Sequence, residues 1–86
     1  MLFRSWQCVP DEELQTQSES VSLKLSRKAP LASAETKKLL QQSHGRNLEE
    51  QLQLEGQTQQ KMGITEDYRE GVQAFLEKRQ PRFQGK

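Results

Sequence analysis

The side chains best suited to bind a charged ligand are four cations close to the C-terminus of the sequence. They are Lys78, Arg79, Arg82 and Lys86. An ammonium or guanidinium group of this kind can bind a phosphate. From the residues alone, however, their position at the C-terminus of an expected helix favours a solvated helix end, whose cations compensate the helix dipole, over a phosphate site.

The other reactive side chains are isolated in the sequence. His44 is the single histidine, and no cysteine or second histidine is spaced to complete a metal site with it. Cys8 is the single cysteine and lies in an apolar, extended segment, where a thiol usually acts as a small hydrophobic group. We therefore expect no metal site and no catalytic residue in this chain.

Adjacent carboxylates occur at three places, each at the start of an expected helix. They are Glu12 and Glu13, Glu49 and Glu50, and Glu66 and Asp67. Capping and the helix dipole explain acidic residues at such positions. None of these pairs indicates an acid/base site.

Helical periodicity and capping residues predict an all-α chain of about four helices. The expected helices cover residues 11–27, 30–42, 47–62 and 65–80, the last ending at Gln80 and Pro81. Asp11 is a candidate cap for the first helix, and Asn47 with Glu50 resembles a capping box for the third. Gly63 is a candidate C′ residue between the third and fourth helices.

The fourth helix carries a well-defined apolar stripe. Its residues are Tyr68, Val72, Phe75 and Leu76, at positions i, i+4, i+7 and i+8. Such a stripe needs a surface to pack against. Phe75 is accordingly either a core residue of this helix or a residue that contacts a ligand, and one side chain can do both.

Composition limits what the chain can do alone. Its 86 residues are 31% hydrophobic, too little for a large core, so a self-sufficient enzyme is not expected. A net charge of +1, from 13 basic and 12 acidic residues, offers no field that would attract nucleic acid or an anionic membrane. With one cysteine and no signal-peptide-like or membrane-spanning run, a cytoplasmic setting fits best.

The last helix and its tail resemble the closing segment of the enoyl-CoA hydratase/isomerase (crotonase) family. The residues that carry the resemblance are Glu66, Asp67, Glu70, Gly71, Ala74, Phe75, Glu77, Lys78, Arg79, Pro81, Phe83 and Gly85. Weaker matches run upstream in the family's order. They comprise residues 8–14, 29–32, 38–40 and 47–55, so that the resemblance covers residues 6–86.

The resemblance implies a role for two residues. In crotonases, the phenylalanine and lysine that match Phe75 and Lys78 commonly lie near the adenine and 3′-phosphate of coenzyme A, often from a neighbouring subunit. An aromatic ring suits adenine and an ammonium group suits a phosphate. The spacing of three residues places both on adjacent turns of one helix face. A coenzyme A thioester would then be the substrate, with no covalently bound cofactor, in a homotrimer or homohexamer.

The resemblance also implies what this chain lacks. Crotonases hold their oxyanion hole and catalytic carboxylates in an upstream core, so we expect a C-terminal fragment that is inactive alone. Residues 1–9 would be a remnant of the last core segment and 10–86 the helical region. Residues 1–5 replace the family's usual Gly-Leu-Val, and residues 2–5 match the translation of a common sequencing adapter. We therefore expect residues 1–5 to be an artefact of a truncated gene model.

The parent reaction would be hydration of a 2-enoyl-CoA or migration of its double bond, in fatty acid or phenylacetate catabolism, which places the intact protein among the lyases or isomerases. The competing hypothesis is a free-standing helical protein that buries its stripes against a partner or a second copy of itself. An independent enzyme is the third and least favoured hypothesis.

Overall fold

The computed structural model describes residues 5–86 and contains, in that range, helices and turns but no strands. The order is a 3₁₀ turn η1 (Asp11–Glu13), α1 (Leu14–Ser26), α2 (Pro30–Gln41), a 3₁₀ turn η2 (Ser43–Gly45), α3 (Leu48–Gly63) and α4 (Glu66–Leu76). The predicted all-α class with four helices is confirmed. Residues 1–4, part of the segment expected to be an artefact, lie outside the described residues.

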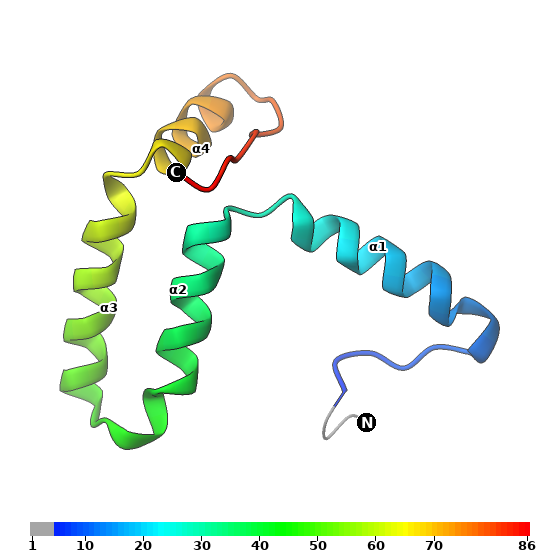
Figure 1. Ribbon diagram of the computed structural model, residues 1–86, viewed down its shortest axis with the longest axis horizontal. Coiled ribbons are helices and arrows are strands. Elements are labelled where there is room, and N and C mark those ends of the chain that lie inside the picture. Colours follow the sequence, from blue (N-terminus) through cyan, green and yellow to red (C-terminus); the bar gives the residue numbers. More distant parts are fainter. Residues whose placement is uncertain (1–4) are drawn as a thin grey trace.

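α2 and α3 form an antiparallel hairpin, and α1 extends away from it (Figure 1). The start of α3 is fixed by the capping box: the N–H of Glu50 donates to Asn47 Oδ1 at 2.9 Å, and the N–H of Asn47 donates to Glu50 Oε2 at 3.1 Å. Lys61 of α3 also pairs with Glu35 of α2 at 3.6 Å. The hairpin therefore rests on a defined turn and a side-by-side contact.

α4 and the C-terminal tail, residues 80–86, lie at the open end of the hairpin (Figure 1, yellow to red). The ring of Phe83 lies over Gly71 of α4, where an added Cβ would be 3.6 Å from the ring. Gly85 lies beside Pro30, the first residue of α2, and has a φ of +77°, which glycine adopts without strain. The tail thus connects the side of α4 to the start of α2.

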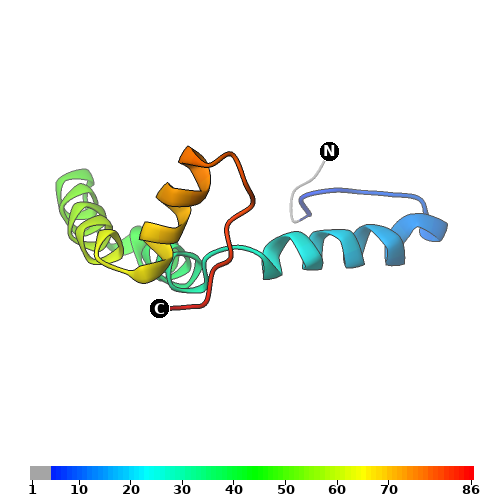
Figure 2. The ribbon, with the colours of Figure 1, turned by 90° about the horizontal axis from the view of Figure 1, so that it is seen from above.

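The helices form a single layer with almost no core of its own. The molecule measures 43 × 39 × 18 Å, and the view from above shows how thin this layer is (Figure 2). Among residues 5–86, Ala74 is the one buried hydrophobic side chain. Most large apolar side chains are exposed, including Trp6 at 77%, Ile64 at 78% and Phe75 at 81%. The predicted stripe of α4 is present, but the described residues cover it only in part, and its side chains remain 45% to 81% exposed.

Three local predictions are wrong. Asp11 makes no capping bond, because it lies inside the 3₁₀ turn in which the N–H of Glu13 donates to the carbonyl of Pro10. Gly63 is the last residue of α3 rather than its C′ residue, and it does not have a positive φ. The fourth helix ends at Leu76 instead of at Gln80, because the chain turns sharply at Lys78.

No helix in the described part of the chain is both long enough and apolar enough to cross a membrane.

The two glycines with contrasting surroundings give a test of the local fold. Gly56 lies inside α3, and a Cβ added there would have no neighbour within 4 Å, so Gly56→Ala should stabilise the helix by about 0.5–1 kcal/mol. Gly85→Ala should instead loosen the tail, because alanine is strained at positive φ. Far-UV circular dichroism measures the helix content of Gly56→Ala, and hydrogen exchange of the Gln84 and Gly85 N–H groups measures the loosening of the tail in Gly85→Ala. A loss of helix content in Gly56→Ala would contradict the exposed position of this residue.

Candidate functional site

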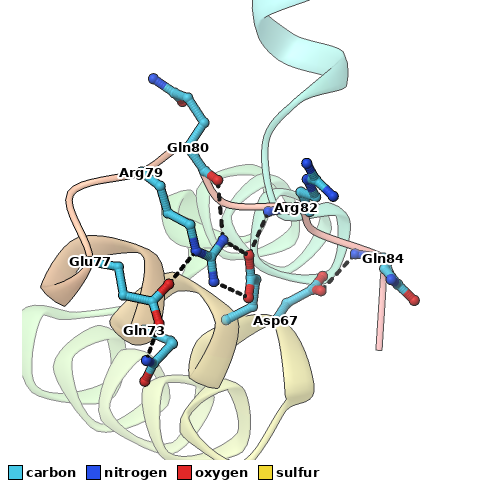
Figure 3. Close-up of polar contacts among 8 residues, drawn as sticks. Asp67, Gln73, Glu77, Arg79, Gln80, Arg82 and Gln84 are labelled. Carbon is cyan, nitrogen blue, oxygen red and sulfur yellow. Dashed lines mark hydrogen bonds and ion pairs between the residues drawn. The ribbon is translucent and has the colours of Figure 1, made fainter.

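The end of the tail is anchored by the carboxylate of Asp67, in the first turn of α4. One oxygen accepts a hydrogen bond from the backbone N–H of Gln84 at 2.7 Å (Figure 3), and the other accepts from the backbone N–H of Gly85 at 2.8 Å. The N–H of Asp67 donates to the carbonyl of Lys86 at 2.9 Å. Asp67 is only 5% exposed, and these bonds compensate the cost of burying its charge. The tail is therefore fixed beside the start of α4.

A second carboxylate, Glu70, holds the beginning of the tail. Its Oε1 accepts from Arg79 Nη1 at 2.6 Å and from the backbone N–H of Arg82 at 2.8 Å, and its Oε2 accepts from Arg79 Nη2 at 3.0 Å. Arg79 Nε also donates to Glu77, so the guanidinium bridges two carboxylates (Figure 3). We call this group of Glu70, Glu77, Arg79 and the N–H of Arg82 the clamp. Two nitrogens of Arg79 bind the two oxygens of Glu70, which is the stronger, bidentate form of an arginine–carboxylate contact.

The clamp changes the protonation of its members. The hydrogen bonds from Arg79 and then from the Arg82 N–H stabilise the ionised carboxylate and lower the pKa of Glu70 from 4.5 to about 2. The pKa of Glu77 is also lowered, by its hydrogen bonds from Gln73 and Arg79. The same contacts raise the pKa of Arg79. The clamp is therefore fully charged at neutral pH.

Between the two ends of the clamp, α4 ends in a Schellman motif at Lys78. The N–H of Lys78 donates to the carbonyl of Phe75 at 3.2 Å, and the N–H of Arg79 donates to the carbonyl of Ala74 at 3.0 Å. Lys78 has a φ of 55° and is the one non-glycine residue with positive φ among residues 5–86. Glycine is the usual residue at this position of the motif.

The two predicted coenzyme A contacts lie at this turn. Phe75 is 81% exposed in the last turn of α4, so it is not a core residue of the described chain. Lys78 is exposed, and its ammonium makes no hydrogen bond or ion pair with any residue from 5 to 86. The expectation that both lie on one helix face is wrong, because Lys78 lies beyond the end of α4. The backbone bond between them keeps them adjacent.

The other sequence candidates do not join this site. His44 is exposed in η2, at the far end of the hairpin, and Cys8 is an exposed free thiol in the N-terminal segment. Cys8 therefore does not pack as the small hydrophobic group that was expected. Of the four cations singled out, Arg79 is bound in the clamp, while Lys78, Arg82 and Lys86 are exposed.

Comparison with known proteins places these features in a family. Residues 5–86 match the family described as enoyl-CoA hydratase/isomerase. The chain belongs to the enoyl-CoA hydratase/isomerase family. A probable enoyl-CoA hydratase from Rhodobacter capsulatus is 40% identical over 81 residues, which are 94% of this chain and 32% of that protein. The 1,2-epoxyphenylacetyl-CoA isomerase of Escherichia coli K12 is 37% identical over 81 residues, 94% of this chain and 31% of that protein.

Solved structures of the family share the same helical arrangement. The enoyl-CoA hydratase from Bacillus anthracis superposes with a TM-score of 0.84 at 31% identity, covering 91% of this chain and 30% of the other. A probable enoyl-CoA hydratase/isomerase from Mycobacterium abscessus gives 0.78 at 33% identity, with 91% and 31% covered. The chain therefore corresponds to the helical region of the crotonase fold and spans about a third of the length of its relatives.

Sequence reasoning does not predict Asp67 and Glu70 as parts of a site. The sequence explains Asp67 as a helix-start residue, and Glu70 contributes only to the family resemblance. Their partners are 9 to 18 residues further along the chain, beyond the end of α4, where there is no regular secondary structure. The signal available in the sequence is the glycine at position 85, which indicates a backbone that needs positive φ.

The low pKa of Glu70 predicts how the clamp responds to acid. A carboxylate whose pKa falls on folding contributes stability above its unfolded value, here 4.5, and loses it as the pH falls through about 2. In a protein that joins residues 6–86 to the core of a relative, hydrogen exchange of the Arg82 N–H should thus be slower with Glu70 than with Glu70→Gln above pH 4.5. The difference, after correction for intrinsic exchange, should vanish towards pH 2. Equal protection in both proteins at pH 6 would contradict the clamp.

Proposed function

We propose that this chain is the helical part of an enoyl-CoA hydratase/isomerase that acts on acyl-CoA thioesters, by hydration or double-bond migration through an enolate. In the intact protein, which would be cytoplasmic and form a homotrimer or homohexamer, Phe75 and Lys78 contact the adenine and 3′-phosphate of coenzyme A. The chain alone is inactive, because the oxyanion hole and catalytic carboxylates of the family lie in its core.

The observation that carries this proposal is the pairing of an exposed aromatic ring with an unpaired ammonium at a fixed turn. A ring that is 81% exposed offers a flat apolar surface, and Lys78 offers a charge with no competing partner in residues 5–86. Family membership supports the substrate class, since the names of both relatives described above, an enoyl-CoA hydratase and a 1,2-epoxyphenylacetyl-CoA isomerase, specify CoA thioesters. The uncovered stripe of α4 supports packing against a larger body.

A hybrid protein tests the two contacts. In the hybrid, residues 6–86 of this chain replace the matching segment of the E. coli 1,2-epoxyphenylacetyl-CoA isomerase, with which they share the alignment described above. The hybrid should isomerise that relative's substrate. Lys78→Met should raise KM about tenfold, the loss of one charge-assisted hydrogen bond, with kcat nearly unchanged because the contact is far from the reacting atoms. Phe75→Leu, which keeps an apolar side chain but removes the aromatic face, should also raise KM.

Lys37→Met is the matched control, because Lys37 is an exposed lysine of α2 outside the proposed site. Its KM should equal that of the parent hybrid. A folded, active hybrid in which Lys78→Met and Phe75→Leu leave KM unchanged would overturn the assignment of these two residues.

The second candidate is a free-standing helical protein that uses its apolar stripes to self-associate. The exposed apolar side chains of α1, α3 and α4 could be buried in a self-associated oligomer as well as against the core of a larger protein. Sedimentation of the purified 86-residue chain distinguishes the two. We expect a poorly folded or aggregating chain, whereas a single oligomer of defined mass with a cooperative thermal transition would support the second candidate.

A further inference from the structure

The backbone of Lys78 is in a conformation that its side chain disfavours. For an L-residue the left-handed region brings Cβ too close to the following carbonyl oxygen, so glycine or asparagine usually occupies the corresponding position of a Schellman motif. Here a lysine occupies it with a φ of 55°. Conformations of this kind persist where surrounding contacts fix them, and they gather at functional sites.

The contacts that fix this turn come from Glu70. It binds both Arg79, which directly follows Lys78, and the N–H of Arg82, three residues further on. Arg79 is also paired with Glu77, directly before Lys78. The residues on both sides of the turn are thus held together, and Glu70 ties them to the second turn of α4. Lys78 itself takes no part in these side-chain contacts.

We propose that Glu70 is a positioning residue for coenzyme A, holding Lys78 in the left-handed conformation in which its ammonium meets the 3′-phosphate. This inference rests on the proposed function. A lysine side chain has a long flexible stem, and fixing its Cα–Cβ direction reduces the conformational freedom lost on binding. Glu70 touches no part of the ligand and acts through Arg79 and the backbone of residues 77–82.

Asp67 provides a contrast within the same segment. Its carboxylate binds the N–H groups of Gln84 and Gly85, beyond the turn, and forms no hydrogen bond or ion pair with Glu77, Lys78 or Arg79. Loosening the tail at Asp67 should therefore affect stability without changing the geometry at Lys78. Asp67 thus has a structural role, whereas Glu70 is proposed to have a positioning role.

The test compares the inhibition of the active hybrid by coenzyme A and by dephospho-coenzyme A, which lacks the 3′-phosphate. The parent hybrid should prefer coenzyme A by about tenfold, the effect of one charge-assisted hydrogen bond. In Glu70→Gln this preference should fall to near one, while inhibition by dephospho-coenzyme A changes less than about twofold. Arg79→Lys, which keeps the charge but cannot form the bidentate pair, should lose the preference as well.

Two controls define the outcome. Glu66→Gln removes an exposed carboxylate of the same helix and should keep the preference, and Asp67→Asn should keep it despite weakening the tail. A parent hybrid without any preference would overturn the proposed function and this inference with it. A parent with the preference and an unchanged preference in Glu70→Gln and Arg79→Lys would overturn this inference alone. If inhibition by coenzyme A and by dephospho-coenzyme A weakened equally in these variants, the role of Glu70 would be purely structural, and this inference would also be overturned.

Discussion

The constraint that governs this structure is its uncovered apolar surface. Residues 5–86 bury one hydrophobic side chain, Ala74, and leave Trp6, Ile64 and Phe75 more than three-quarters exposed. Burying one large apolar side chain stabilises a fold by about 1.5–3 kcal/mol, and helices of 11 to 16 residues are marginal without such packing. The four helices therefore depend on a surface that the described chain does not supply. The thickness of only 18 Å is consistent with a layer of helices that forms one side of such a contact.

The segment from Asp67 to Lys86 is the exception, because polar contacts hold it together. Two carboxylates of α4 bind three backbone N–H groups of the tail, and Arg79 adds a bidentate pair. Hydrogen bonds of this kind fix direction without needing a large core. The turn that carries Phe75 and Lys78 is therefore defined by local contacts, although the apolar face of α4 is not covered by the described residues. Different interactions set the packing of the helices and the geometry of this turn.

The parts of the fold that depend on local chemistry could be predicted from the sequence. The four helices follow from apolar periodicity, and the capping box of Asn47 and Glu50 follows from short-range hydrogen bonding. The N-cap of α4 at Thr65 follows in the same way, with its hydroxyl accepting from the N–H of Tyr68. What could not be predicted depends on contacts between distant residues. The early end of α4 at Leu76 coincides with the turn at Lys78, on both sides of which the chain is bound by the clamp. Within the clamp, Glu70 binds Arg79 and the N–H of Arg82, which lie nine and twelve positions further along the chain without any repeating pattern.

We propose that Phe75 and Lys78 form one end of a coenzyme A site once the apolar face of this layer is covered. A crystal structure of the hybrid protein with coenzyme A bound tests it most directly. We expect the stripe of Tyr68, Val72 and Leu76 to be covered, the Phe75 ring against the adenine, and Lys78 Nζ within about 4 Å of a 3′-phosphate oxygen. Coenzyme A bound with its adenine and 3′-phosphate away from both residues would contradict the proposed role of Phe75 and Lys78.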